Sequence, residues 1–193
     1  ILTSSCDRDH AIQNILTSAF SNAGQKCSAC SLLILEKDIY HDPAFREKLK
    51  DAVLSLHAGS AWDAANFVGP MVTNKHDKLL QAFHLEAGEE WLVAPEFADK
   101  KQYVLKPTVK WGVKAGSYTF TTELFAPLLA VLCMDNLEHG IRLANSSEYG
   151  LTAGLQSLDE REHALWKDKI QAGNLYINRG ITGAIVSRQP FGG

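Results

Sequence analysis

Two nearly continuous apolar runs, 31–35 and 128–134, constrain the fold of this chain more than any other feature. A strand with one face in solvent alternates apolar and polar residues, whereas a strand covered on both faces is apolar throughout. Both runs therefore predict buried strands of a mostly parallel sheet. Such a sheet needs helices on each side, because both of its faces must be kept from water.

Helical patterns lie between these strands. Residues 9–23 place apolar side chains at spacings of three and four, and Asp7 or Asp9 can cap that helix. Asp42 and Pro43 open a second helix, and Asn74 and Asp159 are expected to cap two others. The later helices are expected at 74–85, 137–144 and 160–170, and the shorter strands at 91–94, 103–105, 151–157 and 173–177. This alternation predicts an α/β fold with three layers, αβα.

The bulk composition excludes several classes of protein. With 193 residues, 46% of them hydrophobic and 21% charged, the chain is expected to form one globular domain. A net charge of −3 without a basic run argues against a nucleic-acid partner. No apolar run approaches the roughly 20 residues that span a bilayer. The four cysteines are irregularly spaced, which favours a reducing, cytoplasmic setting over a disulfide framework.

The turn at 22–27 holds the first candidate for chemistry. Cys27 follows a helix and precedes a strand, with Gly24 in the turn and Lys26 beside the cysteine. Nearby backbone N–H groups and the lysine would favour the thiolate, which is the nucleophilic form of cysteine. Most cysteines in such chains are instead small core residues, so Cys27 alone leaves both interpretations open.

Cys27 and Cys30 also form a Cys-x-x-Cys pair. A zinc site needs about four ligands, and neither a second such pair nor a matching pair of histidines accompanies this one, so no metal is expected. A dithiol redox pair stays open, although such pairs usually open a helix and these cysteines lead into a strand.

Two further stretches lie beside expected strands. In 123–127, Glu123 can accept hydrogen bonds from a sugar diol and Phe125 can offer its face to a flat ring. A surface Glu beside a core Phe would explain the same residues. In 178–186, the glycines let backbone N–H groups converge on a small anion, although a plain surface loop would look alike.

Taken together and in this order, these stretches resemble the catalytic domain of the NAD(P)-dependent aldehyde dehydrogenase superfamily. Residues 22–27, Asn-Ala-Gly-Gln-Lys-Cys, match the family's nucleophile motif. Residues 123–127 resemble its Glu-Leu-Phe-Gly-Pro cofactor motif, with Ala126 where Gly is usual. Residues 144–154 and 190–193 resemble two later blocks of the family.

The stretch 178–193 is similar, more particularly, to the Δ1-pyrroline-5-carboxylate (L-glutamate γ-semialdehyde) dehydrogenases, as in bacterial bifunctional proline-utilisation proteins. The resemblance implies that residues 1–193 are a Rossmann-like aldehyde dehydrogenase catalytic domain. It also implies a place in proline catabolism and a homo-oligomeric parent protein.

The resemblance implies a role for each motif. Cys27 would attack the aldehyde to give a thiohemiacetal, which passes hydride to NAD+ and leaves a thioester for water to cleave. The backbone N–H of Cys27 would help to hold the oxyanion. Glu123 would bind the nicotinamide ribose and Phe125 would pack beside the nicotinamide; NADP is not excluded.

The substrate would be held by other residues. The resemblance implies that Ser28, Gly183 and Ala184 hold the α-carboxylate of the substrate and that Phe191 lines its aliphatic part. Neutral donors can orient a carboxylate without burying an unpaired cation.

The resemblance also implies missing parts. Family members carry a cofactor-binding domain, an oxyanion-hole Asn and a general-base Glu before the segment that corresponds to this chain. The chain is therefore expected to be a fragment that cannot turn over substrate alone. Two other classes stay open: a sister aldehyde dehydrogenase with another substrate, and a non-catalytic, aldehyde-dehydrogenase-like structural module.

Overall fold

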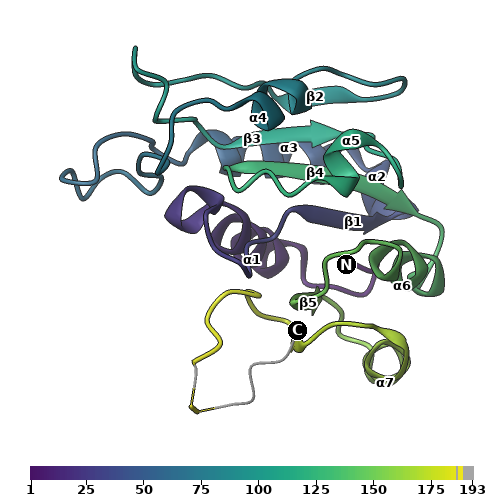
Figure 1. Ribbon diagram of the computed structural model, residues 1–193. Coiled ribbons are helices and arrows are strands. Elements are labelled where there is room, and N and C mark those ends of the chain that lie inside the picture. Colours follow the sequence, from purple (N-terminus) through teal and green to yellow (C-terminus); the bar gives the residue numbers. More distant parts are fainter. Residues whose placement is uncertain (186, 189–193) are drawn as a thin grey trace.

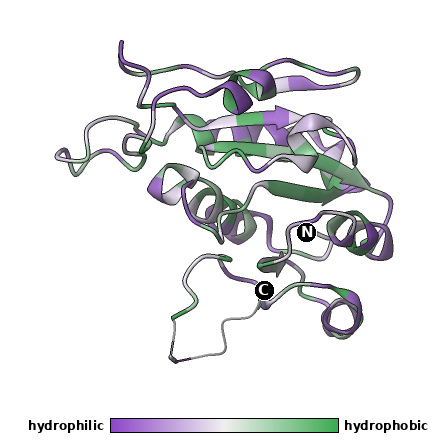
Figure 2. Cartoon of the chain, viewed as in Figure 1, coloured by the Kyte–Doolittle hydropathy of each residue, from purple (hydrophilic) through white to green (hydrophobic). Residues whose placement is uncertain are grey.

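The computed structural model describes residues 1–185, 187 and 188, and its centre is a four-stranded sheet in the order β1-β4-β3-β2 (Figure 1). The strands are β1 (Leu32–Glu36), β2 (Glu90–Val93), β3 (Thr108–Trp111) and β4 (Leu128–Met134). β4 pairs in parallel with β1 and β3, and only the edge strand β2 is antiparallel. The two apolar runs therefore form the buried, parallel centre of the sheet, which Figure 2 shows as its most hydrophobic part.

Side chains of the central strands alternate between two cores. Leu129 and Val131 of β4 belong to the larger core, beneath α1 (Arg8–Phe20), α2 (Lys37–Tyr40) and α3 (Pro43–Leu54). Ala130 and Leu132 belong to a smaller core on the other face, against α5 (Tyr118–Thr121) and α6 (Leu137–Asn145). Helices thus cover both faces, and the predicted α/β fold with a mostly parallel sheet is confirmed.

A second, two-stranded parallel sheet lies beside the first one. It consists of β5 (Thr152–Leu155) and β6 (Asn174–Ile177), covered by α7 (Glu160–Lys169). The first residues of the chain run between the two sheets (Figure 1). Leu2 forms parallel bridges with both Leu35 and Gln156. The backbone pairing therefore continues from the central sheet into the small one.

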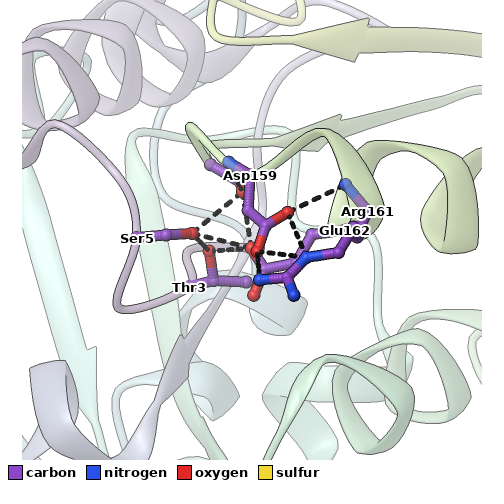
Figure 3. Close-up of polar contacts among 6 residues, drawn as sticks. Thr3, Ser5, Asp159, Arg161 and Glu162 are labelled. Atoms are coloured by element: carbon purple, nitrogen blue, oxygen red, sulfur yellow. Dashed lines mark hydrogen bonds and ion pairs between the residues drawn. The ribbon is translucent and has the colours of Figure 1, made fainter.

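Polar contacts fix this junction. The Glu162 carboxylate of α7 accepts hydrogen bonds from the hydroxyls of Thr3 (2.6 Å) and Ser5 (2.8 Å) (Figure 3). It also accepts one from the hydroxyl of Ser157 (2.5 Å). These three hydrogen bonds to one carboxylate oxygen join the first residues of the chain to the small sheet. Because the acceptor is charged, they are stronger than hydrogen bonds between neutral groups.

The caps of the helices follow the sequence signals with one exception. Asp7, Asp42 and Asp159 accept hydrogen bonds from the first turns of α1, α3 and α7. The expected cap at Asn74 is wrong: α4 (Asp77–Ala82) begins later and His76 caps it. The helix expected at 9–23 ends at Phe20, and a 3-10 turn, η1 (Ser21–Gly24), follows.

One expected strand differs from the structure. The expected strand at 103–105 is only a single bridge, between Leu105 and Phe97. The strand is β3, directly after Pro107, and Lys110 in its middle hides the apolar pattern in the sequence. No helix within the described part of the chain is long and apolar enough to cross a membrane.

Candidate active site

The two central strands bring the candidate motifs together. Cys27 lies just before β1, and the stretch 123–127 lies just before β4. Because β1 and β4 are parallel neighbours, with Leu32 beside Ala130, the segments that enter them meet at one edge of the sheet. The candidate site is therefore at the amino-terminal ends of the strands.

The turn before Cys27 has an unusual backbone. Asn22, Ala23 and Gly24 all have positive φ angles, of 54°, 56° and 67°. Such angles cost a non-glycine residue of order 1 kcal/mol or more, and they cluster at functional sites. Gly24 has a second constraint, because a Cβ there would collide with the backbone carbonyl of Ala126. The turn of the nucleophile motif therefore packs directly on the cofactor motif.

Gln25 joins three segments with its side-chain amide. Its Nε2 donates to the carbonyl oxygen of Phe125 (3.1 Å), and its Oε1 accepts from the backbone N–H of Val72 (3.0 Å). Phe125 also has a positive φ, 50°. One neutral side chain thus holds the turn before Cys27 against the cofactor motif and the loop that contains Val72.

A cavity of about 450 Å³ opens at this edge of the sheet. Cys27, Glu123 and Phe125 all line it. Cys27 and Glu123 are exposed, and Phe125 is 43% exposed despite its aromatic ring. The backbone N–H of Glu123 donates to the hydroxyl of Tyr149 (3.3 Å), another cavity residue. A thiol, a carboxylate and an aromatic face therefore share one accessible space.

The predicted substrate residues lie less close together. Ser28 is buried beside Cys27, and its carbonyl oxygen accepts from the hydroxyl of Thr152 (3.5 Å). Gly183 and Ala184 follow β6, and neither they nor Ser28 are among the described residues that line the cavity. Phe191 lies outside the described residues. The roles of these four residues stay predictions.

The stretch after β6 is nevertheless tied to the helix before Cys27. The backbone N–H of Ile181 donates to the hydroxyl of Ser18 on α1 (3.0 Å). The side chain of Gln156 donates to the carbonyl oxygen of Arg179 (3.1 Å) and accepts from Asn14 of α1 (3.1 Å). These contacts bring the start of the predicted anchor stretch to the cavity, which Ser18 and Ile181 line.

Cys30 lies in surroundings different from those of the exposed Cys27. Cys30 packs against the larger core and its thiol donates to the carbonyl oxygen of Leu32 (3.4 Å). Burial raises the pKa of the Cys30 thiol, which disfavours the thiolate.

Within residues 1–185, 187 and 188, no group of three or more His, Cys, Asp or Glu is arranged to hold a metal ion.

A model of the aldehyde dehydrogenase family matches residues 1–193. This chain belongs to the aldehyde dehydrogenase family. Among its relatives, 1-pyrroline-5-carboxylate dehydrogenase of Geobacillus kaustophilus is 34% identical over 197 residues, which cover 100% of this chain and 38% of that protein. The protein of the same name from Bacillus subtilis is 34% identical over 189 residues, 97% of this chain and 36% of that protein. The chain spans well under half the length of these relatives.

Several solved structures share the fold of this chain. Proline utilization A from Corynebacterium freiburgense is 42% identical with a TM-score of 0.93, over 98% of this chain and 20% of that one. The 1-pyrroline-5-carboxylate dehydrogenase from Thermus with bound NAD is 30% identical with a TM-score of 0.90, over 100% of this chain and 37% of that one.

The sequence motifs do not reveal the residues that hold this candidate site together. Gln25 is inside the nucleophile motif, but nothing in the sequence shows that its side chain reaches Phe125 and Val72. Tyr149 is inside a resembling block, and its contact with Glu123 depends on chain segments distant in sequence.

Proposed function

We propose that this chain is the catalytic domain of an NAD(P)-dependent aldehyde dehydrogenase that oxidises L-glutamate γ-semialdehyde to L-glutamate in proline catabolism. The observation that carries the proposal is the convergence of Cys27, Glu123 and Phe125 on one cavity. The family membership supports the reaction class, and the names of the relatives support the substrate.

Cys27 is proposed to be the nucleophile. As thiolate, its Sγ adds to the aldehyde carbon and forms a thiohemiacetal, while the backbone N–H of Cys27 holds the oxyanion. Loss of hydride leaves a thioester, and water then releases the carboxylic acid and the thiol. An exposed thiol suits this addition, because the substrate must approach it closely.

Glu123 and Phe125 fit the nicotinamide half of the cofactor. The Glu123 carboxylate is exposed and can accept hydrogen bonds from ribose hydroxyls, and the exposed face of Phe125 can pack on a flat ring. When bound, NAD+ accepts the hydride. The structure of the Thermus relative contains bound NAD. No metal is proposed.

Substrate specificity is proposed to lie in Ser28, Gly183, Ala184 and Phe191. Their neutral donors and apolar surface would hold the α-carboxylate and the carbon chain of the semialdehyde. Arg179 is a cation that lines the cavity near this stretch, and it would favour an anionic substrate at longer range.

The cofactor-binding domain, the general base and the oxyanion-hole Asn are proposed to lie in the rest of a longer protein. The chain covers 38% of the Geobacillus relative, which leaves room for them. The isolated chain is therefore expected to bind aldehyde poorly and to produce no NADH.

The test compares the full-length protein with the isolated 193-residue chain. Each is given NAD+ with L-glutamate γ-semialdehyde or with simple aliphatic aldehydes, and NADH formation is followed by absorbance. Turnover of the semialdehyde by the full-length protein alone is expected. Turnover of simple aldehydes only would indicate a sister dehydrogenase, and no turnover at all would indicate a non-catalytic module. NADH formation by the isolated chain would overturn the proposed division into domains.

Specificity is tested by replacing Ser28 or Ala184 with Leu in the full-length protein. The KM for the semialdehyde is expected to rise, and the KM for a simple aldehyde is expected to change much less. Equal losses for both substrates would remove these residues from the anchor.

A further inference from the structure

Lys110 is a charged side chain in the middle of the sheet. It lies on β3 and only 1% of its side chain is exposed. Burial of an ammonium group is costly unless hydrogen bonds and an opposite charge replace water. The position of each Lys110 partner therefore indicates what the lysine holds in place.

The Lys110 ammonium has three polar partners from three segments. Nζ donates to the carbonyl oxygen of His84 (2.9 Å), lies 3.1 Å from the Glu89 carboxylate and donates to the hydroxyl of Thr119 (3.0 Å). Nζ also lies 5.2 Å from the centre of the Trp91 ring. The three N–H bonds of the ammonium match these three acceptors, so the group is fully paired.

Two of these partners hold the segment after α4, and the third holds α5. The Glu89 side chain is 2% exposed, and its carboxylate also accepts from the backbone N–H of Glu86 (2.9 Å). Glu86 in turn accepts from the backbone N–H of Tyr118, the first residue of α5 (2.8 Å). Lys110 and Glu89 therefore reach α5 by two routes, through Thr119 and through Tyr118.

α5 leads directly to the candidate active site. Thr119 and Phe120 line the cavity, and Glu123 follows two residues after the end of α5. A displacement of α5 must therefore move the wall that carries Glu123. A displacement of about 1 Å in such a wall is enough to change catalysis strongly.

We propose that Lys110 is a positioning residue that fixes, through Thr119, the cavity wall that carries Glu123. The effect on cofactor binding rests on the proposed function of Glu123. Stability is a weaker explanation, because a buried ion pair is often no more stabilising than apolar residues of similar volume. A buried and fully paired ammonium group instead fixes each of its acceptors in one position.

The test separates position from stability with four variants. Thr119→Val removes the hydroxyl with little change of volume, and Thr119→Ser keeps it. Lys110→Met combined with Glu89→Gln removes both charges, so that neither is left buried alone. Lys114→Met is the matched control, since Lys114 is exposed and donates to the carbonyl oxygen of Ala87 (3.1 Å) in the same loop.

Amide hydrogen exchange of residues 118–123 is measured on the chain itself, and the KM for NAD+ is measured on the full-length protein. Thr119→Val and the double variant are expected to speed exchange at 118–123, with α1 unchanged, and to raise the KM for NAD+ about threefold to tenfold, the range of one lost hydrogen bond. Thr119→Ser and Lys114→Met are expected to match the wild type.

The inference is overturned if Thr119→Val leaves exchange at 118–123 unchanged, or if Lys114→Met has the same effect as the double variant. Faster exchange at 118–123 with an unchanged KM for NAD+ would overturn the link to Glu123. If the wild-type full-length protein forms no NADH, the proposed function fails instead, and the exchange experiment still decides what Lys110 positions.

Discussion

The face of the central sheet beneath α1, α2 and α3 and the amino-terminal edge of the same sheet are built in different ways. On the face, Leu129 and Val131 are fully buried beneath α1, α2 and α3, in ordinary strand geometry. At the edge, Gly24 and Phe125 have positive φ angles, and an open cavity replaces the packed core.

The difference separates stability from chemistry. Apolar burial on the face stabilises the fold without constraining any one atom tightly. The edge instead fixes individual groups with backbone strain and with side-chain hydrogen bonds such as those of Gln25. Substitutions on the face should therefore change unfolding, and substitutions at the edge should change catalysis.

The largest expected effect is at Cys27. Cys27→Ala is expected to lower kcat of the full-length protein by about 10³-fold or more, because the proposed covalent step would be lost. The free energy of unfolding should change by less than about 0.5 kcal/mol, since the side chain is exposed. Turnover and urea unfolding check the two parts, with Cys133→Ala, on β4, as the control that keeps turnover. Retained turnover in Cys27→Ala would remove the nucleophile assignment.

The opposite pattern is expected on the face. Leu129→Ala leaves a cavity in the core and should lower the free energy of unfolding by about 2–5 kcal/mol. Activity per folded molecule should stay within about twofold, because Leu129 does not touch the site. Leu54→Ala, at a position that is 60% exposed, is the control for urea unfolding. Equal losses of stability in the two variants would contradict the division between face and edge.

Gly24→Ala should combine both effects. The positive φ alone costs about 1 kcal/mol, and the added Cβ must also displace the carbonyl of Ala126. Gly116→Ala is a matched comparison, because Gly116 has a φ of 83° with open space around its Cβ position. We expect Gly24→Ala to be the more destabilising by urea unfolding and the only one of the two to lower kcat. Similar values for both would show that the contact with Ala126 can relax.

The smallest expected effect is the acid response of Asp159, which does not line the cavity. Its hydrogen bonds with Arg161 lower the pKa of the carboxyl to about 2. The contribution of Asp159 to the free energy of unfolding is complete above its unfolded pKa of about 3.9. This contribution is lost as the pH falls through the folded pKa of about 2. The urea midpoint of the wild type should therefore fall between about pH 4 and pH 2, and that of Asp159→Asn should fall less. Arg161→Gln should shift the fall of the urea midpoint to higher pH. Identical acid profiles for the wild type and the two variants would contradict the role of the Asp159 carboxylate as a cap paired with Arg161.

Much of the fold followed from local patterns. The continuous apolar runs predict the centre of a parallel sheet, and Asp42 and Pro43 predict the start of a helix. Both signals can be recognised because they depend on neighbouring residues alone. The nucleophile and cofactor motifs were recognisable from order and spacing. Their meeting follows once β1 and β4 are known to be parallel neighbours.

Three features were decided only by the tertiary structure. The strand around Lys110 has no continuous apolar run, and its buried lysine is tolerated because Glu89 and Thr119 from other segments pair with the ammonium group. The bridging place of Leu2 depends on two sheets that are distant in sequence. The sequence by itself determined which side chains are available for chemistry. Which of them meet was decided by tertiary contacts, because a hydrogen bond such as that from Gln25 to Phe125 joins residues that only the folded chain brings together.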